Sequence, residues 1–173
     1  IMKLNQKIFI TGSSSGIGEA IAYEYASQGA ILGLAARRSE KLESVKAKCM
    51  ELGAQDVKNY SLDVSDTKES ISVAKDFVAF DKEGIDIVIA NAGVAASDNL
   101  SSGDPTKINQ NLNINIIGVT NSIVPFVPTM KFQKAGNIVI MSSIASFTAP
   151  AYFGGYAASK VAVRRLGDTW RTT

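Results

Sequence analysis

The chain has 173 residues, 46% hydrophobic and 20% charged, a composition typical of one globular domain and unlike that of disordered proteins. The net charge of +2 and the isolated basic pairs Arg37-Arg38 and Arg164-Arg165 argue against a nucleic-acid-binding surface. The lack of histidine and the single cysteine, Cys49, exclude His-dependent catalytic triads, His-ligated zinc and intramolecular disulfides.

Short apolar runs rich in β-branched residues alternate with longer amphipathic segments along the chain. The expected strands cover residues 7–11, 31–36, 57–62, 86–90 and 137–142. The expected helices cover residues 16–28, 39–52, 67–80, 106–132 and 156–170. Asp66 is placed to cap the third helix, and residues 97–105 form the one long polar insertion.

This alternation predicts parallel strands joined by right-handed crossovers, with helices on both faces of the sheet. The strands show no alternation of polar and apolar residues, as expected for strands that are buried on both faces. We therefore predict a doubly wound, Rossmann-type α/β fold that forms one dinucleotide-binding and catalytic domain over residues 1–173. Such sheets usually have more than five strands, so we expect a chain truncated after its last helix.

Nothing in the sequence predicts a membrane or secretory segment. The longest apolar runs, such as GAILGLAA at 29–36, are much shorter than the roughly 18 residues of a membrane span, and residues 1–7 (IMKLNQK) lack the apolar part of a signal peptide. Cys49 lies in a polar run, and we interpret it as a structural or partly exposed thiol. We expect a cytoplasmic protein that binds no membrane, nucleic acid or metal.

The stretch TGSSSGIG at 11–18 follows the first strand and opens the first helix, the context that distinguishes a dinucleotide loop from a linker. Its glycines allow a tight turn and a close approach of the backbone to a pyrophosphate, while the N–H groups of the helix face the anion. Glu19 follows where an NTPase phosphate loop requires lysine, which argues against that class. The residues expected to contact the cofactor here are Gly12, Ser14, Ser15, Gly16, Ile17 and Gly18.

The spacing of this loop, TGxxxGxG, resembles that of the short-chain dehydrogenase/reductase family. The resemblance extends from Lys7 to Arg171 and includes Leu62-Asp63-Val64, Asn91-Ala92-Gly93, Asn115 in Asn-Ile-Ile-Gly, Ser143, and Tyr156-Ala-Ala-Ser-Lys160. It implies an oxidoreductase that transfers a hydride between a nicotinamide cofactor and a ketone or secondary alcohol. It also implies a homodimer or homotetramer, and further C-terminal strands with a substrate lid that this chain lacks.

The residues after the second strand bear on the choice of cofactor. NAD-dependent folds usually place an acidic residue where Ala36 stands, and Arg37 and Arg38 follow it here. Two guanidiniums can make forked, charge-assisted contacts to a 2′-phosphate. We therefore predict NADP(H), with Arg37 as the main contact and Ser14 or Ser15 as helpers; the alternative is that both arginines are solvated at a helix start.

Two further segments gain a cofactor role from the resemblance alone. Asp63, with the Val64 backbone, is implied to bind the adenine amino group, and Asn91, Ala92 and Gly93 are implied to pass beneath the cofactor. For Asp63 an alternative stays open, because LDVSDT also reads as ordinary turn and capping chemistry.

Tyr156 and Lys160 are four residues apart on an expected helix, so their side chains lie on one face. An ammonium favours the phenolate and brings the phenol pKa down toward neutral pH. The resemblance implies that Tyr156 is the general acid and base, that Lys160 also holds the nicotinamide ribose, and that Ser143 polarises the substrate oxygen. It implies that Asn115 supports a water between Lys160 and solvent.

Neighbouring residues and a second function compete with this reading. Ser142 lies next to Ser143, and other asparagines lie near Asn115: Asn109, Asn111, Asn113 and Asn121. The apolar segment IASFTAPAYFGGY favours an uncharged, moderately bulky carbonyl substrate; the alternative is a loop that packs against a partner. The alternative to an enzyme is a truncated NADP(H)-binding module without turnover.

Overall fold

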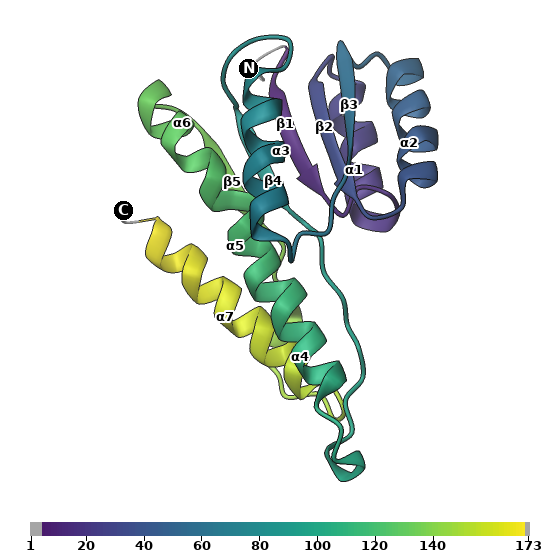
Figure 1. Cartoon of the computed structure of the whole chain (residues 1–173), viewed down its shortest axis with the longest axis vertical. Coiled ribbons are helices and arrows are strands. Elements are labelled where there is room, and N and C mark those ends of the chain that lie inside the picture. The colour runs from purple at the N-terminus through teal and green to yellow at the C-terminus, as the bar shows by residue number, and fades with distance from the viewer. Residues whose placement is uncertain (1–4, 172–173) are drawn as a thin grey trace.

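The computed structural model describes residues 5–171 and contains a five-stranded parallel sheet in the order β3-β2-β1-β4-β5 (Figure 1). The strands are β1 (Lys7–Thr11), β2 (Ile31–Ala36), β3 (Asp56–Ser61), β4 (Ile87–Ala90) and β5 (Asn137–Ile140). After β3 the chain crosses to the other side of β1, so the loops that leave β1 and β4 diverge. A crevice at the carboxyl ends of the strands is expected at this point.

Helices cover both faces of the sheet, as the sequence predicts. They are α1 (Gly16–Ala26), α2 (Ser39–Leu52), α3 (Thr67–Ala79), α4 (Thr106–Leu112), α5 (Gly118–Ile123), α6 (Val127–Gln133) and α7 (Gly154–Trp170). Asp66 caps α3, because its carboxylate accepts a hydrogen bond from Glu69 N at 2.9 Å. The helices α4 and α7 run side by side beyond the end of the sheet (Figure 1). Within residues 5–171 no helix has the length and apolar character needed to cross a membrane.

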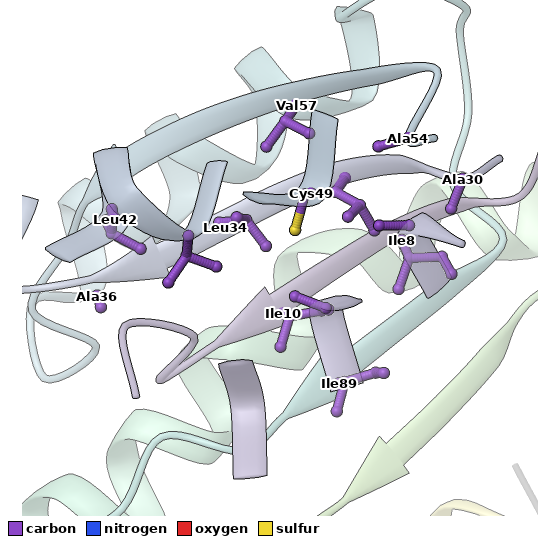
Figure 2. Packing of buried hydrophobic residues seen from close by; sticks show 14 of the residues in the cluster. Ile8, Ile10, Ala30, Leu34, Ala36, Leu42, Cys49, Ala54, Val57 and Ile89 are labelled. Atoms are coloured by element: carbon purple, nitrogen blue, oxygen red, sulfur yellow. The ribbon is translucent and has the colours of Figure 1, made fainter. Parts of the chain in front are cut away.

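Alternate residues of β1 enter two separate cores, since successive side chains of a strand point to opposite faces. Ile8 and Ile10 pack with α1 and α2, whereas Phe9 packs with α3 and the later helices. Figure 2 shows the first core, with the Cys49 sulfur of α2 among aliphatic side chains. Cys49 is fully buried, so of the two alternatives that the sequence left open the structure favours the structural thiol.

The second core contains aromatic rings packed around Phe9. The centroid of its ring is 5.4 Å from that of Phe77 and 4.9 Å from that of Phe126. At the far end of this core, α7 contributes the fully buried Val163 and the partly buried Trp170. Through these contacts α7 is anchored to the sheet along its second half, while its first half projects with α4.

Two predictions about the later elements need correction. The expected helix 106–132 is interrupted by a π turn, η2 (Asn113–Ile117), and by a 3-10 turn, η3 (Val124–Phe126). Pro125 lies in the second interruption, where its ring and missing N–H are incompatible with a continuous α-helix. β5 is exposed rather than buried, with Ile138 at 39% and Val139 at 37%, because it forms an edge of the sheet.

Candidate active site

A pocket of about 430 Å³ opens at the carboxyl ends of the strands. It is lined by Gly12, Ser14, Ser15, Ile17, Ala36, Arg37, Arg38, Leu62, Asp63, Val64, Asn91, Ala92, Gly93, Val94 and Ile114. Most of the residues predicted to contact a cofactor are thus brought together, although they come from four separate loops. Gly16 and Gly18, together with Tyr156 and Lys160, lie outside this lining, and Val94 and Ile114 are lining residues that the sequence analysis missed.

At Gly12 and Gly18 the loop is packed too closely against the end of β4 to allow a side chain. A Cβ on Gly18 would lie 2.5 Å from both Gly12 O and Asn91 Nδ2. Gly12 has a φ of +69°, a conformation that other residues rarely adopt, and its Cβ would lie 2.8 Å from Ala92 Cα. Because these two glycines have no side chain, the loop lies directly against the end of β4, and the two segments together form the floor of the pocket.

Thr11 and Asn91 hold that floor together. Thr11 Oγ1 accepts hydrogen bonds from the backbone N–H groups of Asn91 and Ala92, each at 3.2 Å. Asn91 Nδ2 donates in return to Thr11 O at 3.0 Å and to Gly12 O at 3.3 Å. Thr11 is a site residue that sequence reasoning missed, and its place just before Gly12 at the strand end was the available signal.

The start of α1 is left open for an anion. Ser15 stands at the N-cap position but makes no side-chain capping bond. Its Oγ instead accepts from Arg38 Nη2 at 2.5 Å, and Ser14 Oγ accepts from Arg38 Nε at 3.2 Å and Nη2 at 2.9 Å. Both arginines are exposed and line the pocket, and Arg38 is held at the loop by its bonds to the two serines. The uncapped N–H groups and two guanidiniums make this end of the pocket strongly attractive to phosphate.

Asp63 lines the pocket and accepts two hydrogen bonds from Ser65. Ser65 donates to Asp63 Oδ1 through its backbone N–H at 2.9 Å and its hydroxyl at 2.7 Å. These two bonds hold the pKa of Asp63 below its ordinary value, with a smaller contribution from the charge of Arg37. The turn chemistry left open by the sequence is present, and the same carboxylate also lines the pocket.

Asn115 is fully buried within the π turn η2 and connects two segments of the site. Its Oδ1 accepts from Val94 N at 2.8 Å, and its Nδ2 donates to Val94 O at 2.8 Å and to Ser159 Oγ at 2.9 Å. Ser159 Oγ donates in turn to Tyr156 O at 2.6 Å. Asn115 therefore ties the floor of the pocket to α7, and Ser159 is a further residue that the sequence analysis missed.

Lys160 is buried next to Tyr156. The residue is 5% exposed, its Nζ lies 5.8 Å from the centroid of the Tyr156 ring, and Nζ donates to Met141 O at 2.8 Å. Burial lowers the pKa of Lys160. A Cβ on Gly93 would lie 3.5 Å from Nζ, so the ammonium reaches the edge of the cofactor pocket.

The two neighbouring serines have different environments. Ser142 Oγ donates to Lys160 O at 3.2 Å, which commits its hydroxyl to the backbone of α7. Ser143 Oγ accepts from Ala145 N at 3.2 Å at the start of the 3-10 turn η4 (Ile144–Ser146), and its hydroxyl hydrogen is left to donate elsewhere. This difference favours Ser143 as the donor to a substrate oxygen.

The donor set fits a dinucleotide. The glycine-containing loop, the uncapped helix start and the guanidiniums suit phosphate groups, and the pocket volume is within the range of small-molecule sites. Comparison with known proteins agrees, since residues 6–173 match the family described as short chain dehydrogenase.

The chain belongs to the short-chain dehydrogenase family.

Individual members of this family give a finer comparison. An uncharacterized oxidoreductase of Listeria innocua is 38% identical over 170 residues, which are 96% of this chain and 66% of that protein. An alcohol dehydrogenase of Thermococcus sibiricus, solved in complex with 5-hydroxy-NADP, is 30% identical with a TM-score of 0.89 and covers 96% of this chain and 70% of its own. An NAD+-bound xylitol dehydrogenase is 28% identical with a TM-score of 0.87 over 97% of this chain and 65% of its own.

Proposed function

We propose that this chain is the cofactor-binding and catalytic part of an oxidoreductase that transfers a hydride between NADP(H) and a ketone or secondary alcohol. The observation that supports the proposal is the buried Lys160 ammonium, whose Nζ lies 5.8 Å from the centroid of the Tyr156 ring and next to Gly93, a residue that lines the pocket. The chain spans 66% of the length of its Listeria innocua relative, and the activity is proposed for the protein as a whole.

Bound NADPH would supply the hydride, and the side chains of α7 would manage the proton. Tyr156 donates its phenolic hydrogen to the carbonyl oxygen during reduction and takes a proton from the alcohol during oxidation. Lys160 takes part in none of the salt bridges of residues 5–171, so its charge is available to stabilise the phenolate. Ser143 Oγ donates to the same oxygen as negative charge develops there.

Asn115 and Lys160 supply the support for this chemistry. Asn115 holds Val94, beside Gly93, in place through both groups of its amide, which keeps the pocket floor against Lys160 Nζ. The proposal includes the ordered water between Lys160 and solvent that the family resemblance implies, which would restore the proton of Tyr156 after each turnover.

The preference for NADP(H) rests on three residues at one end of the pocket. Ala36 places no carboxylate near a 2′-phosphate, Arg38 is held at the loop, and Arg37 lines the pocket. The two solved relatives named above hold an NADP derivative in one case and NAD+ in the other, so the prediction depends on these side chains.

Fluorescence titration with NADPH and NADH tests the preference. The unmodified protein is expected to bind NADPH more tightly, and Arg37→Ala or Arg38→Ala to weaken NADPH binding by about tenfold or more, because a charge-assisted hydrogen bond contributes roughly 1.5–3 kcal/mol. Arg165→Ala, an exposed arginine on α7, is the matched control and should change neither affinity. Equal affinity for both cofactors would refute the role of the arginines.

Turnover is tested separately with the full-length protein, NADPH and a panel of uncharged ketones. Tyr156→Phe should lower the rate of reduction by roughly 10²- to 10⁴-fold, the contribution of general acid–base catalysis, while NADPH binding persists. NADPH binding without reduction of any ketone by the unmodified full-length protein would favour the alternative function, a binding module without turnover.

Three further parts of the proposal follow from composition and exposed side chains. The substrate is an uncharged, moderately bulky carbonyl compound, because Ile144, Phe147 and Tyr152 expose 77%, 71% and 67% of their surface after β5.

A homodimer or homotetramer would cover the exposed Ile117 and Val161 on η2 and α7. A reducing, cytoplasmic location suits a chain whose one cysteine is a buried free thiol.

A further inference from the structure

Alternate residues of the segment that follows β4 are hydrogen-bonded through their backbone groups to asparagine side chains of α4 and η2. Asn115 brackets Val94 through both groups of its side-chain amide, as described above. One turn earlier, Asn111 does the same to Ala96: its Oδ1 accepts from Ala96 N at 2.9 Å and its Nδ2 donates to Ala96 O at 2.8 Å. We refer to residues 94–98 as the strap.

The far end of the strap is fastened to the start of α7. Asp98 Oδ2 accepts from Gly155 N at 2.7 Å, and Asp98 N donates to Tyr152 O at 2.7 Å. Phe153, at the N-cap position of α7, makes no side-chain capping bond, so Asp98 supplies that bond from a distant part of the chain. A carboxylate suits this position because the first N–H groups of a helix carry partial positive charge.

Asn111 and Asp98 are buried, so these polar side chains hold backbone groups in place rather than make the surface soluble. Asn111 is fully buried and Asp98 is 8% exposed, and neither lines the cofactor pocket. Burying an amide or a carboxylate costs free energy that an aliphatic side chain would not incur, unless its hydrogen bonds are all made. Their bonds fix the register of the strap between the helix that carries Asn115 and the helix that carries Tyr156.

We propose that Asn111 and Asp98 are positioning residues for catalysis, which hold Tyr156 in register with Asn115 by tying the start of α7 to the strap. Tyr156 directly follows Gly155, in the first turn of α7, where a helix frays unless it is capped. The proposal rests on the proposed function of Tyr156. It adds two residues, from a loop and from α4, to the residues that determine the rate of the proton transfer.

The kinetic test uses the full-length protein with NADPH and a ketone that it reduces. Asn111→Leu is expected to lower kcat roughly ten- to a hundredfold, the cost of displacing a reacting group by about 1 Å, while the affinity for NADPH measured by titration stays unchanged. Asn109→Leu, which alters an exposed asparagine of the same helix, is the matched control and should leave kcat unchanged. A kcat of Asn111→Leu equal to that of Asn109→Leu would overturn the proposal.

A second measurement is independent of activity. Amide hydrogen exchange of Asn111→Leu should accelerate at Ala96 and Gly155, and stay unchanged at Ile10 in the centre of the sheet. Acceleration at all three positions would show a general loss of stability and would overturn a positioning role. Unchanged exchange at Gly155 would also overturn it, because losing the bonds between Asn111 and the strap would then not affect the start of α7.

The Tyr156→Phe background separates this proposal from the proposed function. If Asn111 acts through Tyr156, adding Asn111→Leu to Tyr156→Phe should not lower the residual rate further, since effects through one group are not additive. A further loss would overturn the positioning role while the function stands. Full activity of Tyr156→Phe by itself would refute the proposed function.

Asp98 offers a conservative pair of variants. Asp98→Asn keeps an oxygen that accepts from Gly155 N, and it should retain most of kcat. Asp98→Ala removes the acceptor, and its kcat should fall as far as that of Asn111→Leu. Equal losses in the two Asp98 variants would contradict the hydrogen-bonded tie.

Discussion

Gly18 shows at the level of one residue how tightly the cofactor loop is built. An added methyl group would overlap Gly12 O and Asn91 Nδ2, each 2.5 Å away. Gly18→Ala should therefore displace the loop, destabilise the protein by about 1–3 kcal/mol and weaken NADPH binding. Urea unfolding and cofactor titration measure the two effects.

A second helical glycine provides the control for this prediction. The atoms nearest to a Cβ on Gly154 are the carboxylate oxygens of Asp98 at 3.7 and 3.9 Å, an ordinary contact distance. Gly154→Ala should leave the free energy of unfolding within about 1 kcal/mol of the original, the range of the helix-propensity difference. A loss as large as that of Gly18→Ala would show that the close approach is not the cause.

Sequence spacing predicts which groups lie close together where the spacing falls within one element. The glycine loop and the Tyr156–Lys160 pair are of this kind, because a turn or a helix face determines which of their groups converge. Asn111 and Asp98 could not be found this way, since their partners are backbone groups of Ala96 and Gly155 that only the tertiary path of the strap brings near. For the arginines the sequence predicts the pair, but the structure alone shows that Arg38 is the one bonded to Ser14 and Ser15.

At the scale of elements, Cys49 reports on the packing of α2 against the sheet. Its thiol is buried in the first core, and burial raises its pKa from an ordinary 9.0 to about 11, with a smaller contribution from the charge of Glu19. Below pH 9 the thiol is protonated in the folded and the unfolded chain, so its contribution to stability is complete. Between pH 9 and 11 the unfolded chain loses the proton first, and the contribution falls by roughly 2 kcal/mol near pH 11.

Cys49→Ala isolates this effect from the other groups that titrate in alkali. The difference in unfolding free energy between the original protein and Cys49→Ala should be constant below pH 9 and shrink as the pH rises toward 11. Urea unfolding at a series of pH values measures it. A difference that stays constant up to pH 11 would mean that the thiol is not desolvated and that α2 opens readily.

The elements themselves differ in how far the sequence determines them. The strand and α2 bounds agree with the sequence to within one or two residues, because the strands are short apolar runs and α2 is a longer amphipathic segment between two of them. The long helix was predicted as continuous although Pro125 marks one break. The π turn around Asn115 has no such local signal, because it arises where the Asn115 amide must meet Val94 and Ser159 together.

For the whole molecule, the exposed edge strand β5 is the feature that most affects association between chains. Its burial could not be predicted from its own residues, because what covers a strand depends on the elements beside it. Edge strands with exposed apolar side chains promote pairing between chains. The 173-residue chain should therefore associate at high concentration through Ile138 and Val139.

Light scattering over a concentration series tests this expectation. Val139→Lys should reduce the association, because a charged edge discourages strand pairing. Ile71→Lys, at a residue of similar exposure (40%) on α3, is the control and should have no effect, since a helix has no unpaired edge. Equal effects of the two substitutions would assign the association to general hydrophobicity.

The length of α7 fixes the distance between the fluorescent Trp170 and Tyr156. Trp170, the single tryptophan of the chain, ends the helix whose first turn carries Tyr156, and its indole packs against the second core. Fourteen residues of helix separate the two side chains, a rise of about 20 Å. The indole thus lies at a fixed distance from Tyr156, and, on the proposal that NADPH binds beside Tyr156, energy transfer from Trp170 to the reduced cofactor would report occupancy of the pocket without a label.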